Sequence, residues 1–369
     1  MPGYLQLDSL EKRFGALAVT RGVSLDAKKG EIVALLGPSG SGKTTVLRLV
    51  AGFETPDSGR VVVDGEDVTA LPPERRRFGM VFQHYALFPH MTVGENVAFG
   101  LGRAERGASA ARVAEVLALT GLAGFEARRV TELSGGQQQR VAVARALAPS
   151  PRVLLLDEPL SNLDPTLREK TRRELRRAIR NIGITTLFVT HEQEEAFELG
   201  DRVAVLCDGR LEQIGTPEEL FDRPATRFVA MFIGRSSVVP VRWENGAARL
   251  GGGPLWHARA DVPLADGAEA DLVVRPDSLE IAGGESADSV AGAIVERRFA
   301  GRNAYYVVAR DSGGELEVLG APDAAREGER VHVRPSPGGP TPLVFAREPR
   351  VPTSTLLQRE SIVVRRPGR

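Results

Sequence analysis

The sequence lacks the cysteines, the long apolar runs and the excess of one charge that would place a protein outside the ordinary globular class. Its 369 residues include a single cysteine, Cys207, so no internal disulfide can form, and this thiol, at the end of an apolar run, is expected to be buried and inert. No apolar run could span a bilayer and no signal peptide is recognisable, so a membrane role would require another chain as anchor. The 48 basic and 48 acidic residues cancel, so nucleic acid is not expected as a partner.

The sequence pattern changes near residue 235, and the length of the chain favours two domains. In the first 235 residues, short apolar runs alternate with helical patterns. We expect buried strands at 31–37, 153–157 and 185–191, and helices at 44–51 and 166–182, the second with one buried stripe on a solvated helix. Buried strands that alternate with helices predict an α/β fold with a mostly parallel sheet.

Beyond residue 235 the sequence becomes Gly-rich, with short strand patterns broken by turn residues, as in AYYVVARDSGGELEVLG. This pattern predicts a small all-β barrel or sandwich. The expected domains are therefore 1–235 and 236–350, followed by a flexible basic tail at 351–369.

A phosphate-binding loop is predicted at GPSGSGKTT, which fits G-x-x-x-x-G-K-[ST] between an expected strand and an expected helix. Its glycines allow backbone N–H groups to converge on phosphate oxygens, Lys43 is expected to reach the β- and γ-phosphates, and the Thr44 hydroxyl is expected to bind Mg²⁺. Kinases, GTPases, DNA motors and transport ATPases share this loop, so it predicts a nucleotide but not a reaction. The loop residues expected to bind the nucleotide are Gly37, Pro38, Ser39, Gly40, Ser41, Gly42, Lys43, Thr44 and Thr45.

Polar side chains follow three other apolar strands. In VLLLDEP, Asp157 is expected to help hold Mg²⁺, and Glu158, turned elsewhere by strand alternation, is expected to be the general base that polarises the attacking water. His191 ends another strand, where α/β sheets hold ligands, and is expected to contact the γ-phosphate. Gln83 is expected to contact Mg²⁺ or the water. Each residue has a plain structural alternative, a turn for DEP and an ordinary satisfied side chain for the others, but the upstream phosphate loop favours the functional interpretation.

In order, the chain contains GPSGSGKT, Gln83, LSGGQ, LLLDE, SNLD and His191. This set resembles the nucleotide-binding domain of ABC transporters over about residues 4–235, and LSGGQ is that family's signature. The resemblance implies a P-loop NTPase (ABC ATPase) domain with a helical subdomain at about 85–150. It also implies a head-to-tail homodimer in which each ATP lies between one copy's phosphate loop and the other copy's signature. The residues expected to contact ATP across that dimer are Ser134, Gly135, Gly136, Gln137 and Asp164.

Other roles follow from the same resemblance. Phe14 matches the aromatic residue that stacks on adenine, with a core position in an edge strand as the alternative. Residues 161–164 match the D-loop, which crosses the dimer interface, with Asn162 where the family often has Ala. Residues Tyr85 to Gly102 match the segment that docks a coupling helix of the membrane permease, and Tyr85 and Phe88 either line that groove or belong to the core.

The second domain resembles the C-terminal OB/TOBE-like barrel of ABC importer ATPases, on VVRPDSLEI (273–281) and GAIVERRFAGRNAYYVV (292–308). That resemblance implies an importer of the maltose, polyamine, iron or sulfate groups. The segment QHYALFPHMTV resembles the polyamine, iron and sulfate importers more than the sugar importers.

We therefore expect the ATP-hydrolysing subunit of an ABC importer, with ATP and Mg²⁺ as cofactors. The expected partners are a second copy, an integral membrane permease and, indirectly, an extracytoplasmic solute-binding protein, with this chain peripheral on the cytoplasmic face of the membrane. An ABC-family ATPase acting on DNA or ribosomes is the alternative. Lys43 and Ser134 are only 91 positions apart, which leaves no room for a chromosome-type coiled coil, and ribosome-binding relatives carry two ATPase domains in one chain. A non-catalytic interaction module is disfavoured by the intact Lys43, Asp157, Glu158 and His191.

Overall fold

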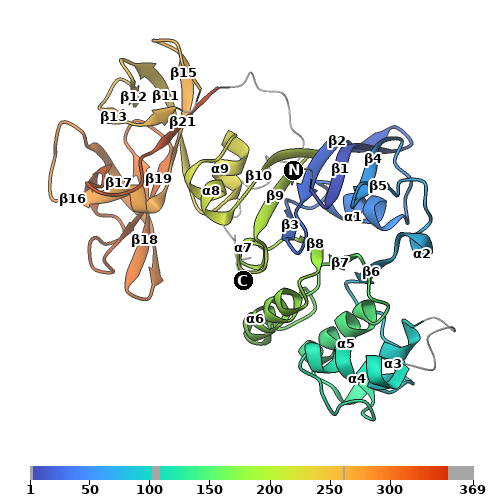
Figure 1. Ribbon diagram of the computed structural model, residues 1–369. Coiled ribbons are helices and arrows are strands. Elements are labelled where there is room, and N and C mark those ends of the chain that lie inside the picture. Colours follow the sequence, from blue (N-terminus) through green and yellow to red (C-terminus); the bar gives the residue numbers. More distant parts are fainter. Residues whose placement is uncertain (1–2, 102–108, 261, 348–369) are drawn as a thin grey trace. The chain divides into compact units, whose positions relative to one another are not determined.

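The computed structural model describes residues 3–101, 109–260 and 262–347. The chain divides into two compact units, Met1–Gly234 and Arg235–Arg369, which are described separately (Figure 1). The expected basic tail at 351–369 lies outside the described residues.

The first unit is built on a six-stranded sheet of order β10-β9-β3-β8-β7-β6. Its central strands run parallel, and β10 pairs antiparallel with β9 at one edge. The parallel strands are mostly apolar and mostly buried, as expected where both faces of a sheet are covered. The strands are β3 (Ile32–Leu36), β6 (Phe78–Val81), β7 (Val153–Asp157), β8 (Thr185–Thr190), β9 (Arg202–Cys207) and β10 (Arg210–Gly215).

Alternate residues of these strands feed two hydrophobic cores, one on each face. In β3, Ile32, Ala34 and Leu36 enter one core, and Val33 and Leu35 enter the other. The mostly parallel α/β sheet predicted from the sequence is thus confirmed. Cys207, at the end of β9, is buried, and burial raises the pKa of its thiol to about 12, which keeps the thiol protonated at neutral pH.

Helices cover both faces of this sheet. Helix α1 (Lys43–Ala51) packs in one core with an antiparallel sheet, β2-β1-β4-β5, that the sequence analysis did not predict. Helix α6 (Pro165–Ile182) enters the other core through Leu175 and Ile179, which confirms its single buried stripe. The remaining elements are β1 (Leu5–Phe14), β2 (Leu17–Ala27), β4 (Ser58–Val63), β5 (Glu66–Asp67), α2 (Pro73–Arg76), α7 (Gln193–Leu199), α8 (Pro217–Asp222) and α9 (Arg227–Phe232).

A group of helices lies beyond the β6 edge of the sheet (Figure 1). Its members are α3 (Val93–Phe99), α4 (Ser109–Leu119), the 3-10 turn η2 (Val130–Glu132) and α5 (Gly135–Leu147). Helix α3 starts at a capping box between Thr92 and Glu95, and α5 starts at another between Ser134 and Gln137. Among the described residues, no helix is long and apolar enough to cross a bilayer.

The second unit is all-β, as predicted, with two sheets around one core. Its largest buried side chain is Trp256, whose Nε1–H donates to the carbonyl of Asp288 at 2.7 Å. One sheet contains β11 (Ser237–Glu244), β12 (Ala247–Arg249), β13 (Leu255–His257), β14 (Arg259–Ala260), β15 (Glu269–Val274) and β21 (Leu343–Ala346). The other contains β16 (Leu279–Ala282), β17 (Val290–Ala300), β18 (Asn303–Arg310), β19 (Glu315–Gly320) and β20 (Arg330–Pro335), with the 3-10 turn η3 (Pro276–Ser278) before β16.

Candidate nucleotide site

The predicted catalytic residues gather at one edge of the parallel sheet. Strands β6, β7, β8 and β3 end at this edge because they run in the same direction. The phosphate loop at 37–42 follows β3, Asp157 ends β7 just before Glu158, His191 follows β8, and Gln83 lies two residues beyond β6. Ligands of open α/β sheets bind at this edge, so the fold places the predicted chemistry where such sheets carry it.

Tight packing forces glycine at two positions of the phosphate loop. A Cβ on Gly37 would lie 2.2 Å from the carbonyl oxygen of Leu206, and a Cβ on Gly42 would lie 2.7 Å from that of Val19. Gly42 is also the N-cap of α1, with a left-handed φ of 97°. The loop backbone is therefore packed closely against neighbouring main chain.

Lys43 is largely buried, with 6% of the residue exposed. Its ammonium donates to the carbonyls of Gly37 at 2.8 Å and Pro38 at 2.9 Å, so it lies folded over the loop. Burial lowers the pKa of Lys43, and the charges of Glu158 and Asp157 oppose that effect. The side chain thus sits at the loop with two carboxylates near enough to influence its charge.

Two adjacent acidic residues concentrate negative charge at the end of β7. Burial raises the pKa of Asp157, and the charge of Glu158 raises it further, whereas Arg48 and Lys43 act in the opposite direction. A bound cation would relieve this repulsion. The Thr44 hydroxyl, the Gln83 amide oxygen and the Asp157 carboxylate are hard oxygen donors of the kind that Mg²⁺ prefers, so the predicted donor set fits Mg²⁺ chemically.

The Glu158 side chain connects three strand ends. Its Oε2 accepts a hydrogen bond from Gln83 Nε2 at 3.1 Å, and its Oε1 lies 3.4 Å from His191 Nδ1. Glu158 has a left-handed φ of 44°, with its N–H bonded to the carbonyl of Val189 at 3.0 Å. The strand ends at Asp157, so a turn, and not the strand alternation assumed from the sequence, sets the direction of Glu158.

The signature turn forms the start of α5. Ser134 is the exposed N-cap, and its hydroxyl accepts from the Gln137 N–H at 3.4 Å while Gln137 Oε1 accepts from the Ser134 N–H at 2.9 Å. A Cβ on Gly135 would lie 2.7 Å from Leu163, and one on Gly136 would lie 2.6 Å from Thr171. The turn is therefore a capped helix start held against the segment that follows Glu158.

Two other predicted contact residues lie on the surface of the unit. Phe14 ends β1 with 48% of its surface exposed, so the core alternative for this side chain is excluded. The Lys12 ammonium lies 5.4 Å from the centroid of its ring. Asp164 is exposed at the start of α6.

Of the two alternatives for Tyr85, a docking groove or the core, the structure shows the core, so its place in a docking groove is excluded. Tyr85 is only 6% exposed and belongs to the hydrophobic core, because a left-handed turn at residues 85 and 86 carries its ring inward. The exposed aromatic surface of this segment is instead Phe99, which is 60% exposed and contacts the half-buried Phe88, with 4.4 Å between the centroids of the two tilted rings. The end of the predicted segment, Gly102, lies outside the described residues.

Sequence reasoning missed Arg145 on α5. Its guanidinium donates to the carbonyls of Tyr85 at 2.6 Å and Ala86 at 2.7 Å, the two residues with left-handed backbone, and lies 5.8 Å from the centroid of the Phe88 ring. The available signal was an arginine within the otherwise apolar run VAVARALA. Its partners lie about 60 positions away, so local sequence could not identify them.

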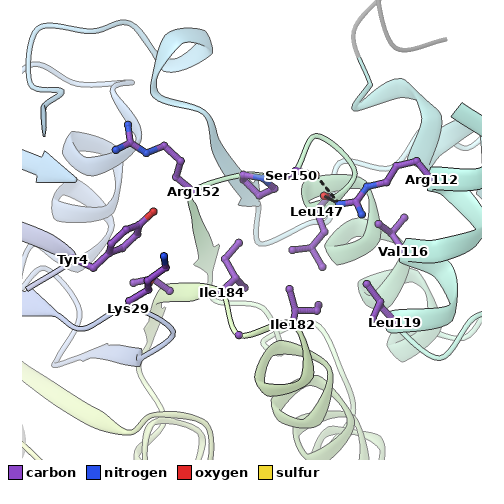
Figure 2. Close-up of a pocket in the computed structure, with 13 residues that line it drawn as sticks. Tyr4, Lys29, Arg112, Val116, Leu119, Leu147, Ser150, Arg152, Ile182 and Ile184 are labelled. Atoms are coloured by element: carbon purple, nitrogen blue, oxygen red, sulfur yellow. Dashed lines mark hydrogen bonds between the residues drawn. The ribbon is translucent and has the colours of Figure 1, made fainter. Parts of the chain in front are cut away.

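A cavity of about 390 Å³ lies at the opposite edge of the sheet, where β7 and β8 begin (Figure 2). Two of its basic side chains already have partners, since Arg112 donates to the carbonyls of Leu147 and Ala148, and Arg152 pairs with Glu66. None of the residues that line this cavity belongs to the predicted nucleotide site.

Comparison with known protein families agrees with this geometry. The ABC transporter family matches residues 20–161, and the TOBE domain family matches residues 272–340. The spermidine/putrescine import ATP-binding protein PotA of Rubrobacter xylanophilus is 45% identical over 346 residues, which cover 90% of this chain and 91% of the relative. This chain belongs to the ABC transporter family. It is an ABC ATPase, with the P-loop fold followed by a TOBE domain.

Other relatives of this ABC ATPase carry different substrate names. The sulfate/thiosulfate import ATP-binding protein CysA of Bradyrhizobium diazoefficiens is 47% identical, covering 90% of this chain and 97% of the relative. The Fe(3+) ions import ATP-binding protein FbpC of Rhizobium etli is 46% identical, covering 85% and 89%. Similar identity to all three kinds leaves the substrate open.

Solved structures match the first unit of the ABC ATPase. The dimeric structure of MJ0796, a bacterial ABC transporter cassette, aligns with a TM-score of 0.50 and 33% identity, covering 57% of this chain and 98% of that one. The structure of cbiO1 from Clostridium perfringens, part of the ABC transporter complex cbiONQ, aligns with a TM-score of 0.56 and 29% identity, covering 61% and 93%.

Proposed function

We propose that this ABC ATPase is the subunit of an importer that closes on ATP as a homodimer and drives a separate membrane permease. The observation that supports it most is the position of Glu158 between Gln83 and His191, at the sheet edge that also carries the phosphate loop. The import ATP-binding proteins that match nearly the whole chain support the direction of transport.

In the proposed reaction, the backbone N–H groups of residues 37–44 and the Lys43 ammonium hold the β- and γ-phosphates. To do so, Lys43 exchanges its bonds to the loop carbonyls for bonds to phosphate oxygens. Glu158 accepts a hydrogen bond from the attacking water and polarises it, while the Gln83 amide and the His191 ring fix the carboxylate from either side. Mg²⁺, held by Thr44, Asp157 and Gln83, supplies charge neutralisation at the phosphates when it is bound.

In this proposal, the N-terminus of α5 binds the nucleotide held by the phosphate loop of the partner copy. An N-terminal turn offers backbone N–H groups and a positive dipole end to an anion, and Ser134 is exposed at that turn. A second copy would bring its phosphate loop to Ser134, Gly135 and Gly136, with Gln137 and Asp164 beside them. The dimeric cassette among the matching structures supports such a pairing.

The Phe88–Phe99 pair is the proposed contact for the permease. An aromatic side chain as exposed as Phe99 favours burial against a partner, and Phe88 is joined through Arg145 to the loop that follows Gln83. Docking there would tie the movement of the permease to the catalytic edge. The chain would thus lie peripherally on the cytoplasmic face of the membrane, with the solute-binding protein acting on the permease from the other side.

The transported solute is proposed to be a small charged one, of the polyamine, sulfate or iron kind named for the relatives. Similar identity to relatives of all three kinds does not distinguish among these solutes. The permease and the solute-binding protein would make that selection.

A complementation experiment tests the composite site. Lys43→Ala removes the phosphate lysine and Ser134→Arg blocks the signature turn, so each variant alone should lose ATPase activity. In a mixed dimer one site still combines an intact loop with an intact signature, so mixing the two inactive proteins should restore part of the turnover. Mixtures that stay inactive, while each variant melts like the wild type, would contradict the shared site.

A further inference from the structure

The three residues after Leu160 contact the catalytic edge at two points and the signature turn at a third. Ser161 Oγ donates to the carbonyl of Glu158 at 3.0 Å. The Asn162 side-chain amide donates to the main-chain carbonyl of Gln83, and its nitrogen lies 3.2 Å from His84 Nδ1. The buried Leu163 side chain packs against Gly135 of the signature turn.

These bonds close a ring around the proposed base. The Gln83 side chain donates to the Glu158 carboxylate, and the Gln83 main chain is bonded by Asn162, only four residues after Glu158. The Glu158 carbonyl is bonded in turn by Ser161. If the main chain at Gln83 moves away from Glu158, the hydrogen bond from Asn162 to the Gln83 carbonyl must therefore break.

Asn162 is itself exposed, so its amide does not serve the hydrophobic core. Solvent could satisfy the same amide at little cost, and a hydrogen bond in that setting contributes little to folding. The Asn162 hydrogen bond matters instead because it fixes the position of the main chain at Gln83.

We propose that Asn162 is a positioning residue: its amide fixes the main chain at Gln83 so that the Gln83 side chain keeps the Glu158 carboxylate directed at the attacking water. This inference rests on the proposed function, in which Glu158 polarises that water. Asn162 does not touch the nucleotide in this arrangement and acts only through Gln83.

The test is steady-state ATPase kinetics of the full chain with Asn162→Ala and Asn162→Asp. Both substitutions remove the N–H donor, so kcat should fall by about three- to tenfold, the rate equivalent of one hydrogen bond, while KM for ATP stays near the wild-type value. Asn181→Ala, at an exposed asparagine near the end of α6, is the matched control and should leave both constants unchanged. Melting temperatures should be equal in all four proteins.

A double-mutant cycle separates positioning from an independent effect. If Asn162 acts through Gln83, Asn162→Ala should add almost nothing to the loss already caused by Gln83→Ala. Additive losses, or wild-type kcat in Asn162→Asp, would overturn the inference. Glu158→Gln distinguishes a failure of the proposed function from a failure of this inference. Full turnover in Glu158→Gln overturns the proposed function. Lost turnover in Glu158→Gln together with wild-type kcat in Asn162→Ala overturns only the role of Asn162.

Discussion

The carboxylate of Glu158 lies between the side chains of Gln83 and His191, with its Oε2 3.1 Å from Gln83 Nε2 and its Oε1 3.4 Å from His191 Nδ1. The three residues follow β7, β6 and β8, which are neighbours in the sheet although Gln83 and Glu158 are 75 positions apart. A residue held from both sides is pre-organised, which is what a general base requires.

Glu158→Gln should lower the ATPase turnover by at least about a hundredfold, because an amide accepts no proton and general bases contribute on that scale or more. ATP should then persist at the site and hold two copies together. Phosphate release and size-exclusion chromatography with ATP measure the two effects. Glu74→Gln, at an exposed glutamate of α2, is the control, and an unchanged turnover rate in Glu158→Gln would refute the assigned role.

Gly37→Ala should weaken both stability and ATP binding. The added Cβ would stand 2.2 Å from the Leu206 carbonyl, so the loop must shift, at a cost of about 1–3 kcal/mol for overpacking. Thermal unfolding and ATP titration measure the two losses. Gly283→Ala, which meets no atom within 4 Å, should match the wild type, and a Gly37→Ala protein with wild-type melting and affinity would show that this close approach is not needed.

Glu195→Gln should stabilise the protein at alkaline pH. Glu195 is 3% exposed, and burial raises its pKa to about 7 from an ordinary 4.5, against the lowering effect of the Thr190 hydrogen bond. The folded state therefore binds a proton that the unfolded state releases, so this group costs stability progressively from about pH 4.5 upward and fully above about pH 7.

The gain in unfolding free energy from Glu195→Gln should thus be near zero at pH 4.5 and reach roughly 3 kcal/mol at most by pH 8. Denaturant unfolding across this range measures it, with Glu194→Gln, the exposed neighbour, as control. A gain that is independent of pH would mean that Glu195 does not titrate as described.

Phe99→Ser should abolish co-purification with the permease while leaving the melting temperature and the ATPase rate of the isolated chain unchanged. Phe99 is exposed and touches Phe88, so its loss removes contact surface without opening the core. Phe299→Ser, at a still more exposed aromatic residue of β17, is the control. Normal recovery of the permease with Phe99→Ser would exclude this docking contact.

The catalytic edge could be predicted from the sequence because its elements carry local signals. Apolar runs such as VLLLD are strands buried on both faces, and the residues that end them lie at one edge by the rule for parallel sheets. The phosphate loop needs glycines that the structure explains by contacts with Leu206 and Val19.

Features set by long-range contacts could not be predicted in this way. Strand β1 mixes charged and apolar residues and contains irregular register around Ser9, so its pattern does not identify a strand. The inward turn of Tyr85 depends on Arg145 from a distant helix, and the direction of Glu158 depends on a left-handed turn. Propensity favours neither conformation, and tertiary contacts impose both.

The central claim, that this ATPase drives a membrane permease, is tested most directly by a pull-down. Tagged Glu158→Gln protein would be recovered with ATP from detergent-solubilised membranes of its own host, and the co-purified chains identified. The account predicts a multi-span permease, whose identity would also name the solute class. Recovery of ribosomes or DNA, with no membrane partner, would contradict the importer and leave only the ATPase chemistry.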